Sequence, residues 1–504
     1  MTLSSHPVLD CAEARAWEAA RLRDEPAEWA AMQRAGDAVA AAVTEDFREL
    51  GGLPPAPRLL VLAGKGHNGG DALLAAARLL ERCPEARADV VLVFPEPAGR
   101  PLMRRAWADL QSVGADRVAQ VERQALLARS YDLCLDGVFG FQFRLPMGEP
   151  AAELLALVNT HPRLRLRAAV DLPSGVGEAG CAGTVFRADF TYATGILKRP
   201  LIDPANAPWV GRLRYLDLGF FADEEPPADA RVLLPSLLAP LAQLRPAQSD
   251  KRTYGHLAVV GGSRRYPGAV LMTVQAALRS GVGLLTAFVP ASLVPEYAAR
   301  FPEAMWVGLP EGPEGGLTAA AADLVAAHAT RATALVVGPG LGAAAETLAA
   351  VQVIVRQAGV PLVLDADALR PEVLAAAAGQ RVICTPHAGE AKRLGASAAP
   401  NLVLVLKGSP TRICAGGPVF YSCFGGPVLA RGGSGDLLAG LIGGLLAQAP
   451  ADLRLAAARG TVWHGLAADL LARDKGQVAV QTTQLLDYLQ PALRLAADHA
   501  TPSP

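Results

Sequence analysis

Short apolar segments alternate with helical segments along the chain, and this alternation most restricts the possible fold. In the first half the apolar segments have the length and composition of strands: Leu59–Ala63, Val90–Phe94, Leu133–Val138 and Ala168–Leu172. The segments between them have helical spacing: Ala72–Leu80, Pro101–Val113 and Ala151–His161. This pattern predicts a parallel sheet with helices on both faces. Ligands of such sheets bind at the carboxyl ends of the strands, so we expect functional residues there.

The same pattern starts again at His256–Val260. Further strands are expected in the second half: Leu284–Val289, Ala334–Val337, Leu362–Leu364, Val382–Thr385 and Asn401–Leu406. A hairpin is expected over Thr411–Ser422. The stretch 220–250, with Asp-Glu-Glu-Pro-Pro at 223–227, has the composition of a linker. The sequence therefore predicts an α/β protein made of two three-layer domains, 1–225 and 226–504.

Charge and cysteine usage exclude several classes of protein. The formal net charge is −1, so nothing favours nucleic acid or an anionic membrane as a partner. Mean hydropathy is +0.25, but no apolar run is long enough to span a bilayer. The N-terminus lacks the basic segment and apolar core of a signal peptide. Seven cysteines are scattered and never spaced as CxxC, which favours a reducing cytoplasm.

Gly432–Asp436, reading Gly-Gly-Ser-Gly-Asp, runs into the apolar segment Leu437–Ala447. The apolar segment is typical of a buried helix, so the glycines would lie at its N-terminus, where free N–H groups and the helix dipole bind anions. Asp436 in the first turn could accept a proton from a hydroxyl. A phosphate cradle beside a base suits phosphoryl transfer to an alcohol. The alternative is a Gly-rich turn with Asp436 as N-cap.

Four other clusters follow expected strands in the second half. Gly338–Gly342 is expected to open a helix, and Asp365 ends the next strand. Thr385–Glu390 contains His387, and Lys407–Thr411 places a lysine beside glycine, where it can meet a polyphosphate. Taken singly, Asp365 could be a strand-end cap, His387 a structural histidine and Glu390 a helix-start acid. Together with Asp436 they indicate one site.

The first half has a comparable set of strand ends. Gly64–Asp71 is not a P-loop, and its match to a dinucleotide fingerprint is weak. Asp136 and Asp171 each end an expected strand and could be cap or turn acids. Three such ends in one sheet favour a site.

These motifs resemble the YjeF N-terminal domain, the NAD(P)H-hydrate epimerase family. The matching motifs span about the first 220 residues: Met32, Ala35-Gly36, Gly-x-Gly-x-Asn-Gly-Gly-Asp at 64–71, Asp136 with Phe139-Gly140, Asp171–Gly175, Ala188-Asp189, Lys198 and Asp217–Gly219. The resemblance implies a Rossmann-like fold for 1–225 and interconversion of the R and S forms of hydrated NAD(P)H.

The same resemblance implies site residues. Residues that would bind the hydrate are His67, Asn68, Gly69, Gly70, Asp71, Gly140, Phe141, Gln142, Phe143, Arg144, Leu145, Pro146 and Asp171. Asp171 would transfer the proton, and a potassium ion would be held by Asn68, Asp136 and Ser174. Oxygen ligands suit a hard cation. This chain has His67 where the family usually has Asn, and bulky Phe141 and Phe143 in a turn that is usually small, so we expect a reshaped pocket.

The second half resembles the YjeF C-terminal domain, the ADP- or ATP-dependent NAD(P)H-hydrate dehydratase of the ribokinase-like superfamily. Order and spacing hold over 231–490 for these motifs: Lys251, Gly255-His256, Gly261–Ser263, Tyr266–Ala269, Pro302–Met305, Gly338–Gly342, Asp365–Leu369, Thr385–Glu390, Lys407–Thr411, Gly432–Asp436 and Trp463–Gly465. Gly425-Gly426 and Arg431 depart from the usual Gly-Asn and Thr, but neither removes an expected catalytic group.

This resemblance implies a mechanism with Asp436 as base. Asp436 would deprotonate the ring hydroxyl, which takes phosphate from the nucleotide, and the ring nitrogen would then expel phosphate and restore NAD(P)H. The hydrate would be bound by Ala269, Gly340, His387 and Asp436. The nucleotide would be bound by Lys407, Gly408, Ser409, Pro410, Thr411, Gly432, Gly433, Ser434 and Gly435. Mg²⁺ would accompany the phosphates. We expect ADP as co-substrate, AMP and phosphate as products, and a homo-oligomer.

Two alternatives stay open from the sequence. The second half could be a small-molecule kinase that phosphorylates a stable alcohol with the same Asp436 and anion site. Residues 1–220 could be a binding module without catalysis, which the departures at His67 and Phe141 favour.

Overall fold

The computed structural model describes residues 3–498 except 142, 145, 179, 182 and 314. The chain forms two compact units, an N-terminal unit that consists mainly of His6–Val232 and a C-terminal unit that consists mainly of Leu233–Ala472. The predicted fold class, two α/β units that each place helices on both faces of a largely parallel sheet, is confirmed. Where each functional domain begins and ends stays a prediction.

The N-terminal unit is built on a parallel sheet of seven strands in the order β11-β9-β6-β5-β2-β3-β4. The strands of this unit are β1 (Ser5–Leu9), β2 (Arg58–Ala63), β3 (Arg87–Leu92), β4 (Val118–Gln120), β5 (Tyr131–Gly137), β6 (Leu164–Val170), β7 (Val176–Gly177), β8 (Gly180–Cys181), β9 (Phe190–Thr194), β10 (Leu197–Lys198), β11 (Arg212–Leu216) and β12 (Ala230–Leu233). Its helices are α1 (Cys11–Arg21), α2 (Glu25–Phe47), α3 (His67–Arg82), α4 (Pro101–Gly114), α5 (Glu149–Asn159) and α6 (Ala207–Val210).

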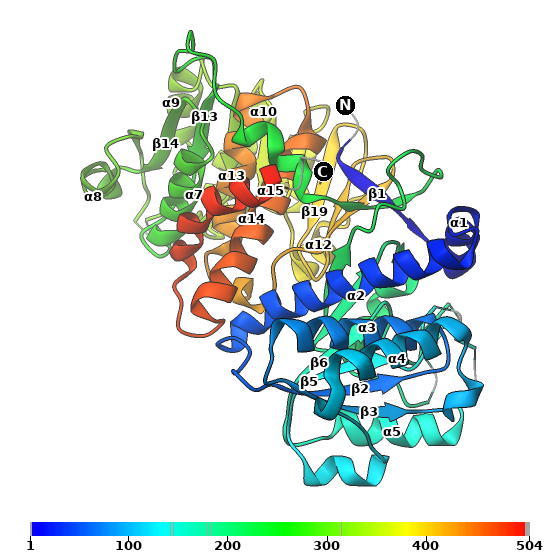
Figure 1. Ribbon diagram of the computed structural model, residues 1–504. Helices are drawn as coiled ribbons and strands as arrows, with labels where there is room; N and C mark the ends of the chain where they lie inside the picture. Colours follow the sequence, from blue (N-terminus) through cyan, green and yellow to red (C-terminus); the bar gives the residue numbers. More distant parts are fainter. Residues whose placement is uncertain are drawn as a thin grey trace. The chain divides into compact units, whose positions relative to one another are not determined.

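Helices cover both faces of this sheet, as Figure 1 shows. Side chains alternate along β2: Leu59 and Val61 pack with α2, α3 and α4, whereas Leu60 and Leu62 pack with α5. Because both faces are covered, β2 is a continuous apolar run rather than an alternating one. This arrangement is the Rossmann-like layering expected from the sequence.

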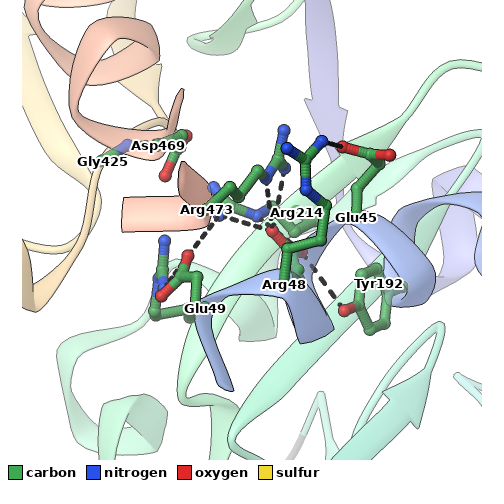
Figure 2. A network of polar contacts seen from close by, with 10 residues as sticks. Glu45, Arg48, Glu49, Tyr192, Arg214, Gly425, Asp469 and Arg473 are labelled. Carbon is green, nitrogen blue, oxygen red and sulfur yellow. Dashed lines mark hydrogen bonds and ion pairs between the residues drawn. The ribbon is translucent and has the colours of Figure 1, made fainter. Parts of the chain in front are cut away.

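Charged side chains hold the end of α2 against the sheet (Figure 2). Arg214 of β11 donates two hydrogen bonds of 3.0 Å to the buried carboxylate of Asp46, and the Tyr192 hydroxyl lies 3.2 Å from it. Burial acts to raise the pKa of Asp46, but the guanidinium groups of Arg214 and Arg473 together outweigh burial, and the pKa lies below its ordinary value. The Glu49 carboxylate accepts hydrogen bonds of 2.7 and 2.6 Å from Arg212 Nη1. These ion pairs explain how the sheet accommodates two arginines, Arg212 and Arg214, in β11.

The C-terminal unit contains strands in the order β21-β20-β19-β18-β17-β16-β13-β14-β15. Their bounds are β13 (His256–Val260), β14 (Leu284–Pro290), β15 (Met305–Leu309), β16 (Ala334–Val337), β17 (Leu362–Leu364), β18 (Val382–Cys384), β19 (Leu402–Leu406), β20 (Thr411–Cys414) and β21 (Val419–Ser422). The pairs from β15 to β19 are parallel, whereas β19-β20 and β20-β21 are antiparallel. The hairpin predicted over Thr411–Ser422 is confirmed.

Helices cover this second sheet on both faces as well. They are α7 (Pro267–Arg279), α8 (Val294–Arg300), α9 (Ala321–His328), α10 (Ala345–Gln357), α11 (Pro371–Ala376), α12 (Ala388–Leu394), α13 (Ser434–Gln448), α14 (Leu453–Lys475) and α15 (Leu489–Asp498). Leu257 and Val259 of β13 pack with α7, α13 and α14, whereas Ala258 and Val260 pack with α9 and α10. The predicted buried helix after Asp436 is confirmed, since α13 is buried from Leu437 to Ala447.

Two sequence-based element boundaries are wrong. Helix α3 begins at His67 rather than Ala72, so Asn68–Asp71 form its first turns instead of a loop. Gly69 and Gly70 permit this start, because a Cβ at either position would overlap Gly64 or the Met32 side chain. Gly338–Gly342 does not open a helix directly, since α10 begins at Ala345.

Among the residues that the structure describes, no helix is both long enough and apolar enough to cross a membrane.

Candidate functional site

The first candidate site lies at the strand ends of the C-terminal unit, around a buried acid. Asp365 directly follows β17 and is 1% exposed. Its Oδ1 lies 3.1 Å from the ammonium nitrogen of Lys407, which directly follows β19, and accepts a hydrogen bond of 2.7 Å from the Thr385 hydroxyl. Lys407 also lies 3.8 Å from a carboxylate oxygen of Glu390. Three strand ends therefore converge on one lysine.

The Gly-Gly-Ser-Gly-Asp segment meets this cluster. Gly433 caps α13 with a φ of 93°, a conformation that favours glycine, and the helix begins at Ser434. A Cβ at Gly435 would lie 3.1 Å from Lys407 Nζ and 3.9 Å from Asp365 Oδ2. The N-terminus of a fifteen-residue helix, a lysine and the carboxylate of Asp365 are thus brought together.

Asp436 is the third residue of α13 and does not cap the helix, so the N-cap alternative is wrong. Burial raises the pKa of its carboxyl to about 6, and repulsion from Asp365 adds to this while Lys407 opposes it. A carboxyl with this pKa is largely ionised at neutral pH and remains a much better proton acceptor than an exposed aspartate.

His387 lies next to Lys407 at the sheet edge, because the two residues form an isolated parallel bridge. The His387 ring caps α12 by accepting from the backbone N–H of Gly389 at 3.0 Å, and the Glu390 carboxylate accepts from the His387 N–H at 2.8 Å. Glu390 therefore acts as the expected helix-start acid. The imidazole is still largely exposed, at 61% of its side-chain surface.

The remaining predicted residues of this unit flank the same edge. Gly340 lies against Ala269, since a Cβ at Gly340 would lie 3.0 Å from Ala269 Cβ, and its φ is 69°. The Gly342 N–H donates to Asp367 at 2.8 Å. Lys407–Thr411 connects β19 to β20, with the Thr411 hydroxyl bonded to the Gly408 carbonyl at 3.1 Å. Gly425, one of the two departures noted above, donates to Asp469 at 3.0 Å (Figure 2).

The second candidate site is a cavity of about 260 Å³ in the N-terminal unit. Seven of the predicted hydrate-binding residues line it: His67, Asn68, Asp71, Gly140, Phe141, Phe143 and Asp171. Gly69, Gly70, Arg144 and Pro146 are not among the described residues that line it, and Gln142 and Leu145 lie outside the described residues. Phe141 and Phe143 form part of the wall, as expected from their bulk.

Lys198 and three acids, Glu18, Asp71 and Asp171, form a cluster in the wall of this cavity, which Lys65 and Glu28 also line. Lys198 is 1% exposed, and its Nζ lies 2.5 Å from Asp171 Oδ1 and 3.8 Å from Glu18 Oε1. Asp171 has a φ of 66°, which is unusual for a residue with a side chain. The ring of Phe141 lies 4.9 Å from Lys198 Nζ.

Two of these carboxyl groups hold protons unusually tightly. Burial raises the pKa of Glu18 to about 7, against the opposing effect of Lys198, and repulsion from Asp171 adds to the increase. Burial also raises the pKa of Asp71 well above its ordinary value, and the Asp171 and Glu18 charges act in the same direction. Asp71 Oδ1 is buried without a hydrogen-bond partner.

The three predicted potassium ligands lie beside this cavity. Asp136 is fully buried and accepts from the Ser174 hydroxyl at 2.6 Å and the Ser174 N–H at 2.8 Å. Burial raises the pKa of Asp136 to about 6, against these hydrogen bonds. Asn68 donates to the Phe139 carbonyl at 3.0 Å, which leaves its Oδ1 buried without a partner. An orphaned amide oxygen and neighbouring oxygen donors fit a hard cation.

Sequence reasoning missed Glu18 as a site residue and gave Lys198 no role. The only local signal for Glu18 is an acid on the buried side of an Ala-rich helix, and its partner lies 180 positions away in sequence. Asp365 was weighed as a possible cap, although a strand-end Asp two residues before a second Asp could have suggested a larger role. Thr194, which lines the cavity and lies 3.2 Å from Asp171, carried no signal.

Comparisons with known proteins match both units. A family model described as NAD(P)H-hydrate dehydratase matches residues 257–491, and one described as YjeF-related protein N-terminus matches residues 29–200. A relative from Gloeobacter violaceus, named bifunctional NAD(P)H-hydrate repair enzyme Nnr, is 39% identical over 93% of this chain and 94% of its own. A relative of the same name from Moorella thermoacetica is 34% identical over 92% of each chain.

Among solved structures, the Bacillus subtilis ADP/ATP-dependent NAD(P)H-hydrate dehydratase, co-crystallised with ATP and Mg²⁺, is 27% identical. The match covers 50% of this chain and 94% of that chain, with a TM-score of 0.43.

Proposed function

Since the chain belongs to the family of bifunctional NAD(P)H-hydrate repair enzymes, we propose that its two units carry out two successive steps of this repair. Residues 1–225 epimerise R- and S-NAD(P)HX, and residues 226–504 dehydrate S-NAD(P)HX to NAD(P)H with consumption of ADP. The products of the second reaction are AMP and phosphate. The family membership confirms the two resemblances found in the sequence.

In the C-terminal unit Asp436 takes the proton of the ring hydroxyl as phosphate is transferred to it. The raised pKa of Asp436 supports this role, because the carboxylate is desolvated but ionised at neutral pH. Backbone N–H groups of Gly432–Gly435 and the Lys407 ammonium stabilise the negative charge on the transferred phosphoryl group. His387, Gly340 and Ala269 hold the hydrate, and Lys407–Thr411 holds the nucleotide. Mg²⁺ bound with the nucleotide would neutralise the charge of the phosphates.

In the N-terminal unit the hydrate enters the cavity of about 260 Å³, where Asp171 transfers the proton. Asn68, Asp136 and Ser174 would hold potassium, and the orphaned Asn68 Oδ1 supports this assignment. The aromatic wall of Phe141 and Phe143 gives the ring an apolar surface and does not close the cavity. We also assign the chain to the cytoplasm, expect a homo-oligomer and choose ADP over ATP.

One observation carries the dehydratase assignment: Asp436, Lys407 and Asp365, from three separate segments, converge at the N-terminus of α13. The test is incubation of the intact chain with a mixture of hydrated NADH epimers and ADP. The expected result is return of NADH absorbance until both epimers are consumed, with one AMP and one phosphate per NADH. An accumulating phosphorylated alcohol would instead identify a small-molecule kinase.

A second measurement tests the epimerase half. The isolated segment 226–504 is expected to stop after consuming the S epimer, and adding Asp171→Asn to the intact chain should have the same effect. An Asp171→Asn chain that consumes both epimers at the normal rate would identify residues 1–220 as a binding module.

A further inference from the structure

The cavity of the N-terminal unit is lined by more acidic side chains than the proposed epimerisation requires. Glu18 of α1, Asp71 of α3 and Asp171 after β6 all line it, and Lys198 lies between Asp171 and Glu18. Three carboxylates cannot all stay ionised beside one buried ammonium, because each added negative charge opposes the next. Asp171, at 2.5 Å from Lys198, is best placed to carry the charge.

Glu18 differs from Asp71 in how it can exchange a proton. Asp71 is half-buried, its Oδ1 is buried without a hydrogen-bond partner, and it forms no ion pair with Lys198 among the described contacts. Glu18 keeps 23% of its side-chain surface exposed and is 3.8 Å from Lys198 Nζ. A group that lines the cavity, contacts the lysine and gains or loses its proton near neutral pH suits proton transfer.

We propose that Glu18 is a second catalytic residue of the epimerase, which acts as the acid opposite the base Asp171, with Lys198 linking the two carboxyl groups. This inference rests on the proposed function of the N-terminal unit. It adds a residue from helix α1 to a site whose other members lie at strand ends and on α3.

The chemistry of a ring carbon that bears both nitrogen and hydroxyl explains why two groups are needed. The ring nitrogen forms a double bond to this carbon as the carbon–oxygen bond breaks, and Glu18 gives its proton to the departing oxygen, which leaves as water. Water then adds to the opposite face, the nitrogen regains its electron pair, and Asp171 takes the proton of the new hydroxyl. Lys198 donates a proton to Glu18 and takes one from Asp171, which restores the starting state.

The test is the rate at which purified R epimer is converted to S epimer without ADP, corrected for the uncatalysed reaction, across pH 5.5–9. Wild type is expected to slow above pH about 7, where Glu18 loses its proton. Glu18→Gln keeps the shape of the side chain but cannot donate a proton in this way. We expect it to be about 10²- to 10⁴-fold slower and to lack the alkaline decline.

Three controls make the result specific. Glu13→Gln changes an exposed acid on the same helix and preserves its N-terminal capping pattern, so its epimerisation should match wild type. Glu18→Asp retains an acid one methylene shorter and should keep a reduced rate together with the alkaline decline. In ¹⁸O-labelled water each inversion should place one labelled oxygen in the product.

The outcomes separate two failures. If wild type does not epimerise at all, the proposed function of the unit is wrong. If wild type epimerises and Glu18→Gln keeps its rate and pH profile, Glu18 is only an ionic partner of Lys198 and the inference is wrong. An epimer that retains its original oxygen would also overturn it, because the carbon–oxygen bond would not have broken.

Discussion

Gly435 lies directly against the ammonium group of Lys407, and a Cβ at position 435 would be 3.1 Å from the Lys407 Nζ atom. This spacing is tighter than ordinary van der Waals contact. The glycine therefore allows the N-terminus of α13 and a lysine from a strand end to approach each other closely, as the proposed phosphate site requires.

Gly435→Ala is expected to slow dehydration about tenfold to a hundredfold, because the methyl group displaces Lys407 by a few tenths of an ångström and narrows the anion site. Stability should not fall, since alanine favours helix more than glycine by up to about 1 kcal/mol. Gly417→Ala is the control, because a Cβ there meets nothing within 4 Å and the residue lies in the turn between β20 and β21, outside the proposed site. Steady-state rates of both variants check this, and equal losses would contradict it.

Asp436→Asn is expected to reduce dehydration at least about a thousandfold while nucleotide binding largely survives, since the amide cannot accept the hydroxyl proton. In wild type the rate should fall as the pH drops below about 6, where Asp436 becomes protonated. A pH–rate profile and calorimetric titration with ADP check both statements. Retained turnover in Asp436→Asn would remove Asp436 from this role.

The same substitution should stabilise the protein. The pKa of Asp436 is higher in the folded state than in the unfolded state, so the folded state binds more protons between pH 4 and 6. Its stability therefore falls as the pH rises through this window and stays lower above it. Asp436→Asn should remove this penalty, up to about 3 kcal/mol at pH 8. Urea unfolding at pH 4 and pH 8 measures the difference, which should be present only at pH 8.

Several features of both sites followed from the sequence, because strand ends and Gly-rich turns are local signals. The anion site before α13 was predicted from its glycines and the apolar helix that follows them, and the acids at 136 and 171 were predicted from the ends of apolar strands. The start of α3 at His67 was not predicted, because Gly69 and Gly70 have low helix propensity. The reason for these glycines is their close contact with Gly64 and Met32, which only the structure shows.

Contacts between distant segments explain what the sequence could not show. Arg212 and Arg214 made β11 difficult to recognise, and their partners are Glu49, in the short 3-10 turn Arg48–Leu50, and Asp46, at the end of α2. In the sequence, Glu18 cannot be told from other helical acids, and only the fold shows that Lys198 of β10 lies beside it. Such pairs follow from topology, since no local pattern marks either member.

Asp71→Asn should be tolerated by the fold. Burial keeps the Asp71 carboxyl protonated to a pH well above its ordinary pKa, so a neutral amide replaces a neutral acid of the same shape. In wild type the folded state binds the extra proton, and stability should fall as the pH rises from about 4 towards the raised pKa. Each tenfold difference in proton affinity contributes about 1.4 kcal/mol. Unfolding at pH 5 and pH 8 should show a smaller pH dependence in Asp71→Asn than in wild type.

Potassium is expected to support epimerisation and not dehydration. The buried Asn68 Oδ1 lacks a partner, and an unsatisfied buried oxygen costs about 1–3 kcal/mol unless a ligand binds it. Replacing K⁺ with tetramethylammonium at equal ionic strength should therefore slow conversion of R to S epimer several-fold. Asn68→Ala should be slow in both salts, because the amide oxygen that distinguishes them is gone. Dehydration of S epimer, measured with the same preparations, is the internal control. Equal epimerisation in both salts by wild type would contradict the potassium assignment and leave Asn68 as a hydrogen-bond donor to Phe139 alone.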